Sequence, residues 1–380
     1  MSAAREARKT DPSVRVTAVT EESHLPYYRP LLTRRIADEA VERNPSFLLN
    51  REEWYGENSI ELVLNERIVS LDTGAGIARA ESGRVFPYDR LILATGSSPF
   101  VPMEGALDRE NVFAVRTLDH ARAVSLCLDT AERVVVVGGG VLGIEAADAV
   151  VRSGRQAWIV EMAERILPLQ LDEEGSVMLE SILRERGCRL MLGDSLESLA
   201  GERRVDKVRL KSGGEIPADA VIFSVGIRPR TELAVSLGIT VNRGMIVNER
   251  METNLSGVYC CGEAAEFGRC IGLWMPSVRQ GTVAGRNAAG GDAVFTNEDY
   301  PATLNAFGTT VFSIGDLGKK EEAGRYSVVK RSSPGLYKKL YFLGSVLSGG
   351  LFIGDNRKSQ ALLAAMREGA GMDRAADLLE

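Results

Sequence analysis

The sequence has little histidine and no segment suited to binding nucleic acid or crossing a membrane. His24 and His120 are the only histidines among 380 residues, which excludes a three-histidine metal site and leaves little for a histidine-based triad. No strongly basic segment accompanies the net charge of −6, so DNA or RNA is not an expected partner. No run of about 18 apolar residues and no signal peptide is present, and we expect a soluble, cytoplasmic protein.

The five cysteines do not form a disulfide framework. Their number is odd, and they show neither CxxC pairs nor the spacing of an extracellular domain. Cys260 and Cys261 are adjacent in a predicted strand, so their side chains point to opposite faces and a disulfide between them is not expected. We predict buried free thiols in a reducing compartment. The residues are Cys127, Cys188, Cys260, Cys261 and Cys270.

Glycine and β-branched residues form the strongest local pattern of the chain. A Val-rich strand over residues 133–137 ends in three glycines, and residues 141–153 then carry apolar side chains at helical spacing. A second strand over residues 157–160 ends at Glu161. This order of strand, tight turn, helix and strand predicts a β-α-β unit.

The glycines of this unit match the G-x-G-x-x-G pattern of a dinucleotide-binding loop, after a strand and at the start of a helix. They permit the turn and a close approach of the backbone to pyrophosphate, which the helix N-terminus also favours. Glu161 lies where a carboxylate can accept hydrogen bonds from ribose hydroxyls and would repel a 2′-phosphate, which favours NADH; the alternative is a solvated acid at a strand end. The predicted contacts in the loop are Gly138, Gly140, Val141, Leu142 and Gly143.

A second, weaker copy of this design opens the chain. Residues 3–9 are predicted as the end of a helix, and residues 14–20 as a strand followed by Glu21 and Glu22. A strand followed by Gly-x-x-Pro also occurs twice, in residues 88–99 and 218–229. We interpret this as an internal duplication of one nucleotide-binding plan.

The chain is long enough for two or three domains. The motifs divide it into a discontinuous first domain over residues 1–105 and 238–298, a second domain over residues 106–237, and a third over residues 299–380. The third region contains alternating strand-like runs and a last helix.

These motifs together resemble a known superfamily. Residues 94–96, 225–229 and 257–263, with the triple-glycine loop, resemble the flavoproteins with two dinucleotide-binding domains of the pyridine nucleotide-disulfide oxidoreductase superfamily. Residues 25–31 and 274–287 look most like NADH:rubredoxin oxidoreductases and the flavin domains of NADH-dependent nitrite reductases. The resemblance implies an α/β fold with two Rossmann-like FAD/NAD(P)-binding domains of the three-layer ββα type, plus a small C-terminal α+β domain. It also implies FAD on the first domain and NADH on the second.

The resemblance assigns further cofactor contacts. Glu21 and Glu22 would hold the adenosine ribose of FAD, Arg29 would contact its pyrophosphate, and the backbone of Ile68 would touch adenine. Trp274 is assigned equally to core packing or to a flavin contact. The remaining predicted contacts are Thr95, Gly96, Gly226, Gly262 and Glu263.

The resemblance also places two charged residues near the site of hydride transfer. Glu145 lies in the first turn after the glycine loop, where related enzymes carry an acid beside flavin and nicotinamide. Arg34 occupies the position of a lysine that pairs with this acid in some relatives. We predict a catalytic Arg34–Glu145 ion pair, with ordinary surface charges as the alternative.

Three departures from the superfamily pattern bear on function. No cysteine precedes Cys127, so a thiol relay beside the flavin is not expected. Glu263 stands where relatives have Asp, and Arg230 where they have Asn. Counting back from Glu21 by the spacing of the complete unit leads beyond residue 1, and we expect the natural reading frame to begin some 15–20 residues earlier by this analogy.

The resulting hypothesis is an FAD-dependent NADH oxidoreductase that passes electrons to a small redox protein, rubredoxin or another iron protein. Alternatives are a flavin component of a nitrite-reductase-like system, an NADH oxidase, or a flavin-deficient NADH-binding scaffold subunit. The chain is expected as a monomer or homodimer. Four lysines in the third region would either attract an acidic partner or be plain surface charges. They are Lys319, Lys320, Lys338 and Lys339.

Overall fold

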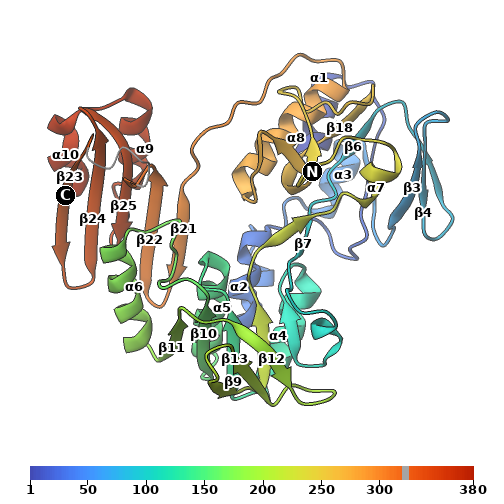
Figure 1. Cartoon of the computed structure of the whole chain (residues 1–380). Helices are drawn as coiled ribbons and strands as arrows, with labels where there is room; N and C mark the ends of the chain where they lie inside the picture. Colours follow the sequence, from blue (N-terminus) through green and yellow to red (C-terminus); the bar gives the residue numbers. More distant parts are fainter. Residues whose placement is uncertain (319–324) are drawn as a thin grey trace. The chain divides into compact units, whose positions relative to one another are not determined.

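The computed structural model describes residues 1–318 and 325–380, which divide into two compact units (Figure 1). Unit 1 comprises Met1–Leu31, Ala40–Phe100 and Gly226–Glu298. Unit 2 comprises Leu32–Glu39, Val101–Val225 and Asp299–Glu380. Each unit is thus assembled from three separated segments, and unit 2 holds both the glycine-loop motif and the C-terminal region.

Unit 2 is built on a parallel five-stranded sheet. The strands are, in spatial order, β11 (Cys188–Leu192), β10 (Gln156–Glu161), β9 (Arg133–Val137), β15 (Ala220–Phe223) and β8 (Val112–Ala114). Four consecutive valines of β9 are buried, as expected for a central strand that is covered on both faces. The predicted β-α-β unit thus forms the centre of the sheet.

Two further layers cover this sheet. One is an antiparallel sheet of β12 (Leu196–Ala200), β13 (Lys207–Leu210) and β14 (Glu215–Pro217), whose apolar side chains share a core with β9, β10 and β15. The helices are α2 (Leu32–Ala37), α4 (Leu118–Leu128), α5 (Val141–Arg152) and α6 (Glu173–Glu185). α5 packs against β9 and β10 and also contacts α2. This is the predicted ββα arrangement.

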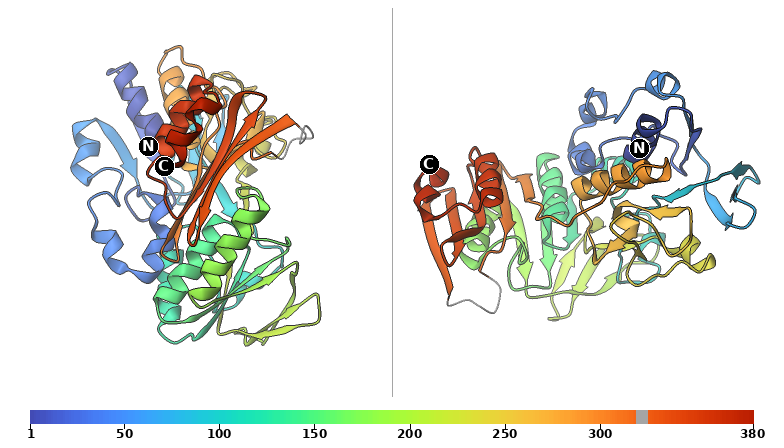
Figure 2. Two further views of the ribbon diagram at one scale, coloured as in Figure 1. Left: turned by 90° about the vertical axis from the view of Figure 1, so that its left-hand side faces the viewer. Right: turned by 90° about the horizontal axis from the view of Figure 1, so that it is seen from above.

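The C-terminal part of unit 2 is an antiparallel sheet with helices beside it (Figure 2). Its strands are, in spatial order, β21 (Ala302–Ala306), β22 (Thr309–Gly315), β25 (Val346–Ile353), β24 (Leu336–Leu343) and β23 (Tyr326–Ser333). α9 (Ser359–Glu368) and α10 (Ala375–Leu379) share an apolar core with β22, β24 and β25. The predicted small α+β region is confirmed.

One carboxylate joins α6 to this C-terminal sheet. Asp172 caps α6 by accepting a hydrogen bond from the Gly175 N–H at 2.9 Å. Its other oxygen accepts hydrogen bonds from Tyr337 at 2.8 Å, and from Lys339 and Tyr341 at 2.7 Å each. These donors alternate along β24, so they share one face of the strand.

The lysines proposed as surface charges on β24 have a different role. Lys338 is buried and its Nζ lies 3.0 Å from Asp355, whereas Lys339 is half-buried and its Nζ lies 2.7 Å from Asp172. Both the steering and the plain-surface interpretations are therefore wrong for Lys338, which is buried, and Lys339 is held by Asp172 on the other face of the strand. Lys319 and Lys320 lie outside the described residues.

Unit 1 contains several small sheets. Its parallel pairs are β1 (Val16–Val19) with β2 (Ile60–Val63), and β6 (Leu91–Leu93) with β18 (Val258–Cys260). Its antiparallel sheets are β3 (Ile68–Asp72), β4 (Ile77–Ala80) and β5 (Val85–Pro87), and β7 (Ser97–Pro99) and β16 (Ile227–Pro229). A mixed sheet joins β17 (Met245–Ile246), which is parallel to β19 (Ala265–Phe267), and β20 (Arg269–Cys270), which is antiparallel to β19. The two Gly-x-x-Pro segments of the repeated design thus pair with each other through β7 and β16.

Helices complete unit 1. They are α1 (Ser2–Thr10), α3 (Glu52–Glu57), α7 (Glu232–Ser236) and α8 (Trp274–Ala288). α1 packs directly on α8. The two helices are so close that a Cβ on Gly285 would overlap the backbone of Ala3. Short 3-10 helices in the two units are Arg29–Leu31, Glu39–Arg43, Ala106–Asp108, Gly262–Ala264 and Met372–Arg374. No helix in the described part of the chain is long and apolar enough to span a membrane.

All five cysteines are free, and three of them are buried. Burial raises the pKa of the Cys188 thiol to about 12 and that of Cys261 to about 11, and it raises the pKa of Cys260 well above its usual value. These thiols therefore stay protonated at neutral pH and are poor nucleophiles.

Candidate functional site

The glycine loop of unit 2 needs glycine at two positions because the backbone is crowded there. Gly138 has a φ of +108°, and a side chain on it would overlap the carbonyl oxygen of Ser224 at the end of β15. A side chain on Gly143 would overlap the carbonyl oxygen of Gly138. The first and third glycines of the motif thus allow the tight turn and the close packing of α5 on the loop.

The second glycine of the motif has a different environment. Gly140 is the N-cap of α5, and a Cβ built on it would meet no atom of the described residues within 4 Å. Packing within the protein therefore gives no reason for a glycine here. The open space lies at the N-terminus of a 12-residue helix, where the N–H groups of Val141 and Leu142 and the helix dipole favour an anion. This local geometry fits the pyrophosphate of a dinucleotide.

Glu161 is held at the end of β10 by backbone donors. Its Oε2 accepts a hydrogen bond from Gly139 N–H at 2.6 Å, and its Oε1 accepts one from Ala163 N–H at 2.8 Å. Each carboxylate oxygen keeps a lone pair for a ribose hydroxyl. Within residues 1–318 and 325–380 no salt bridge compensates its charge, so the carboxylate retains the repulsion toward a 2′-phosphate that the sequence suggested.

Glu145 lies in the first half of α5 and contacts α2. Thr33 Oγ1 donates a hydrogen bond to Glu145 Oε2 at 2.8 Å. Burial raises the pKa of Glu145, against the lowering effects of the Thr33 hydrogen bond and the Arg34 charge, and Asp148 adds to the rise.

The predicted Arg34–Glu145 ion pair takes a different form in the structure. In the described part of the chain Arg34 makes no salt bridge with Glu145, and its charge acts over a longer distance. Thr33, its neighbour on α2, supplies the direct contact instead. Sequence reasoning missed Thr33 because a hydroxyl next to an arginine carries no signal of its own.

The first candidate ribose ligand of unit 1 is engaged by arginines. Glu21 pairs with Arg230 and lies 3.8 Å from Arg67. The backbone of Arg230 is itself anchored, because its carbonyl accepts from Thr95 Oγ1 at 2.8 Å and its N–H donates to the carbonyl of Gly96 at 2.9 Å. The predicted residues Glu21, Thr95 and Gly96 are thus brought together around Arg230.

The second candidate ribose ligand forms its own cluster. Glu22 pairs with Arg29 and accepts a hydrogen bond from the Tyr27 hydroxyl at 2.6 Å. The Arg29 guanidinium also lies 5.2 Å from the centre of the Tyr27 ring. Arg29 therefore contacts one of the predicted FAD ligands directly, and its role toward pyrophosphate stays a prediction.

A buried side-chain amide near Gly262 has a donor without a hydrogen-bond partner in the described residues. Gly262, with a φ of +78°, donates its N–H to Gln280 Oε1 at 2.9 Å. Gln280 is buried, and its Nε2 has no hydrogen-bond partner in the described residues. Glu263 accepts a hydrogen bond from Ser97 Oγ at 2.8 Å. An unpaired donor next to ordered acceptors fits a polar cofactor such as FAD in unit 1.

The other predicted contacts of unit 1 lie on separate elements. Trp274 begins α8 and packs edge-on against Tyr28, with ring centres 4.9 Å apart, which supports the packing interpretation. Ile68 begins β3 opposite Ala80. Gly226 has a φ of +110° and an open Cβ position, so its glycine is required by conformation rather than by crowding.

Comparison with protein families identifies the family of the chain. Residues 1–285 match the model of the pyridine nucleotide-disulphide oxidoreductases, and residues 301–370 match that of the rubredoxin NAD+ reductase C-terminal domain. The chain belongs to the pyridine nucleotide-disulphide oxidoreductase family. Its members use FAD and NADH, so the predicted family, fold class and cofactors are confirmed.

Individual relatives point to several electron-transfer systems. The chain is 33% identical over 358 residues to "Nitrite reductase [NAD(P)H]" of Bacillus subtilis, covering 93% of this chain and 44% of that protein. It is 31% identical over 307 residues to "NADH-rubredoxin oxidoreductase" of Clostridium acetobutylicum, covering 80% and 76%. A solved NAD-dependent persulfide reductase from A. fulgidus superposes with a TM-score of 0.89 at 25% identity, covering 99% and 76%. The chain thus spans less than half of its nitrite reductase relative.

Proposed function

We propose that this chain is a flavin-dependent NADH oxidoreductase that delivers electrons to a small iron protein such as rubredoxin. The observation that carries this proposal is the glycine loop, in which the first and third glycines are packed and Gly140 faces open space at a helix N-terminus. A loop of this kind needs a ligand to account for its second glycine.

The residues of the chain have separable tasks in this function. The N–H groups after Gly140 bind pyrophosphate, and Glu161 orients a ribose. FAD, when bound, supplies a group that accepts a hydride and can release electrons one at a time. Thr33 donates a hydrogen bond to Glu145 Oε2, which leaves Oε1 as the oxygen that can carry a proton. Burial raises the pKa of this carboxyl and so favours the protonated form. The charge of Arg34 lowers that pKa.

The cysteines support delivery to an external acceptor. None precedes Cys127, and the buried thiols of Cys188, Cys260 and Cys261 have raised pKa values. A cysteine relay would need a reactive thiolate near the flavin. We therefore infer that electrons leave without a covalent thiol intermediate.

The identity of the acceptor has two main candidates. The match of residues 301–370 to the rubredoxin reductase C-terminal domain favours a small iron protein. The identity over 93% of this chain to a nitrite reductase favours a flavin component of such a system as the second candidate. A direct oxidase is a third outcome of the same experiment.

Anaerobic stopped-flow tests the proposal with purified protein loaded with FAD. NADH is expected to bleach the flavin absorbance faster than steady-state turnover, and the reduced protein is then mixed with rubredoxin, with a sirohaem partner, or with oxygen. Fastest reoxidation by rubredoxin supports the first candidate, and fastest reoxidation by either other acceptor replaces it. Flavin that NADH does not reduce, or protein that binds NADH but no FAD, refutes the proposal.

A further inference from the structure

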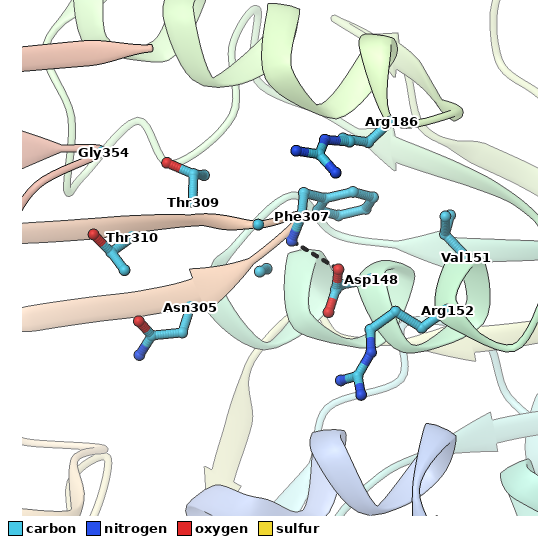
Figure 3. A pocket seen from close by; sticks show the side chains of 11 residues that line it. Asp148, Val151, Arg152, Arg186, Asn305, Phe307, Thr309, Thr310 and Gly354 are labelled. Atoms are coloured by element: carbon cyan, nitrogen blue, oxygen red, sulfur yellow. Dashed lines mark hydrogen bonds between the residues drawn. The ribbon is translucent and has the colours of Figure 1, made fainter.

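Unit 2 has a cavity of about 600 Å³ that no part of the proposed function uses (Figure 3). It lies between the second half of α5, the end of α6 and the hairpin of β21 and β22. The glycine loop is at the opposite end of α5, which at 1.5 Å per residue is about 18 Å long. The cavity is therefore distinct from the dinucleotide site.

The hairpin at this cavity has a strained turn. Ala306 pairs with Thr309, so the loop consists of Phe307 and Gly308, which both adopt left-handed φ values of 51° and 70°. This conformation favours asparagine or glycine, and phenylalanine is unfavourable in it. Phe307 is buried, and its N–H donates to Asp148 Oδ1 on α5 at 2.7 Å. Such strain persists where the surroundings fix the residue, and it is enriched at functional sites.

Two guanidinium groups lie on either side of the Asp148–Phe307 contact in Figure 3. Arg152 ends α5 and Arg186 is the C-cap of α6. Neither makes a salt bridge within the part of the chain that the structure describes. A Cβ on Gly308 would come within 3.2 Å of the Arg186 guanidinium, so the glycine lets this group lie close to the turn. The two arginines outnumber Asp148, the one carboxylate of the lining, so the charged groups of the cavity have a net positive charge.

Two hydroxyls of the cavity lack partners. The Oγ1 atoms of Thr309 and Thr310 are buried, and neither has a hydrogen-bond partner among the described residues. Both residues line the cavity, as does the exposed side chain of Asn305. Buried polar atoms without partners in a native fold indicate a bound water, ion or ligand. The size of the cavity is in the range of small-molecule sites.

We propose that this cavity binds a small phosphate-bearing anion, with Arg152 and Arg186 as charged donors and the hydroxyls of Thr309 and Thr310 as neutral ones. Guanidinium groups match phosphate oxygens through paired, charge-assisted hydrogen bonds. The hydroxyls can donate to the same oxygens or bind the ester side of an organic phosphate. The two sources of this chemistry are free phosphate and a phosphate ester.

Isothermal titration of the full chain with inorganic phosphate and with ribose 5-phosphate, at constant ionic strength, tests this proposal. Arg152→Gln and Arg186→Gln are each expected to weaken binding by about tenfold, and the double variant more. Arg184→Gln is the matched control, because Arg184 is exposed on α6 but does not line the cavity. Thr309→Val removes one unpaired hydroxyl with little change of shape and should weaken binding by severalfold.

The outcomes separate clearly. Binding that the double variant loses and the control keeps supports the site; tighter binding of ribose 5-phosphate identifies an ester as the ligand, and equal binding identifies free phosphate. If the wild-type chain binds neither probe at millimolar concentration, the proposal is wrong and the arginines serve only to offset the helix C-termini. Binding that survives in the folded double variant also overturns it, because the anion then sits elsewhere.

Discussion

The sequence predicts one nucleotide-binding design in both units, but their described strands pair differently. In unit 2, β9 has parallel partners on both sides, β10 and β15, within one continuous sheet. In unit 1, the described parallel strands form three separate pairs, β1 with β2, β6 with β18 and β17 with β19. A strand with hydrogen-bonded neighbours on both edges belongs to one continuous sheet, which holds the loop at its carboxyl end in place. In unit 2 that loop is the glycine loop after β9.

The difference extends to how each site is held. In unit 2 the candidate site is made by backbone crowding and backbone hydrogen bonds over residues 138–161. In unit 1 the predicted ligands are engaged by ion pairs, Glu21 with the distant Arg230 and Glu22 with the nearby Arg29. Steric and buried changes in unit 2 should therefore have larger effects than charge changes in unit 1.

The largest effect is expected at Asp172. Asp172→Ala removes the 2.7 Å partner of the half-buried Lys339 and the acceptor of Tyr337 and Tyr341, so it should lower the free energy of unfolding by about 2–4 kcal/mol. Chemical denaturation measures this, with Glu174→Ala on the exposed side of Lys339 as control. A loss below 1 kcal/mol would show that the C-terminal sheet does not depend on this contact.

The pH dependence of stability has a definite sign at Asp172. Burial opposes its charge, but the hydrogen bonds from Lys339, Tyr341, Gly175 and Tyr337 outweigh burial and lower its pKa. A lowered pKa in the folded state stabilises the protein above the ordinary aspartate value, and this contribution is lost as the pH falls through the lowered pKa. Asp172→Asn should make unfolding less sensitive to acid in this range.

The next effect concerns Glu145. Glu145→Gln keeps a side chain that can accept from Thr33 but cannot exchange a proton, so we expect flavin reduction by NADH to slow about a hundredfold. An unchanged rate would refute the proposed role. The pH profile of the wild-type rate should show an inflection above the ordinary pKa of a glutamate, because burial raises the pKa of Glu145. The variant should lack this inflection.

Stability responds to Glu145 with the opposite sign to Asp172. A raised pKa in the folded state means that the carboxyl contributes most below its unfolded pKa, and the contribution is lost as the pH rises through the folded value. At neutral pH this loss makes the buried carboxyl destabilising, and Glu145→Gln should remove that destabilisation. A Glu145→Gln variant that is more stable but reduces flavin more slowly would show that the buried acid destabilises the fold and also serves the reaction.

Two glycines of one motif give the third comparison. Gly143→Ala places a methyl group onto the Gly138 carbonyl and should destabilise the fold by about 1–3 kcal/mol. Gly140→Ala meets no described atom and should cost about 1 kcal/mol or less, yet it should weaken NADH binding because its methyl fills the approach to pyrophosphate. Thermal unfolding and NADH titration of both variants measure the contrast. Equal effects of the two variants on stability would contradict it.

Local patterns predicted unit 2 well. The strand, helix and strand around the glycine loop appear within one or two residues of their expected bounds, because consecutive buried valines and glycines with special φ values are strong local signals. The alternation of side chains along β24 was also readable, but two adjacent lysines favour a surface interpretation unless their carboxylate partners are known. The partners, Asp355 and Asp172, are 17 and 167 residues away.

The polar contacts of unit 1 were less predictable. Glu21 was correctly located at a strand end, but its pairing with Arg230 joins residues 209 positions apart. The Ser97–Glu263 and Gly262–Gln280 hydrogen bonds likewise depend on how distant loops meet. A single sequence holds no periodic signal for such pairs, since the partners are far apart in the chain and belong to different elements.

The smallest effect is expected where unit 1 relies on charge. Glu21 and Arg230 are each more than a third exposed, so Arg230→Gln should change the free energy of unfolding by at most about 1 kcal/mol, and less at high salt. If Glu21 holds a ribose of FAD, freeing it from Arg230 should change FAD affinity more than stability. Fluorescence titration with FAD and denaturation of the same variant compare the two, with Arg15→Gln, which loses the exposed pair with Glu61, as control. A large stability loss without a change in FAD affinity would show that unit 1, like unit 2, uses this contact to hold its fold rather than its ligand.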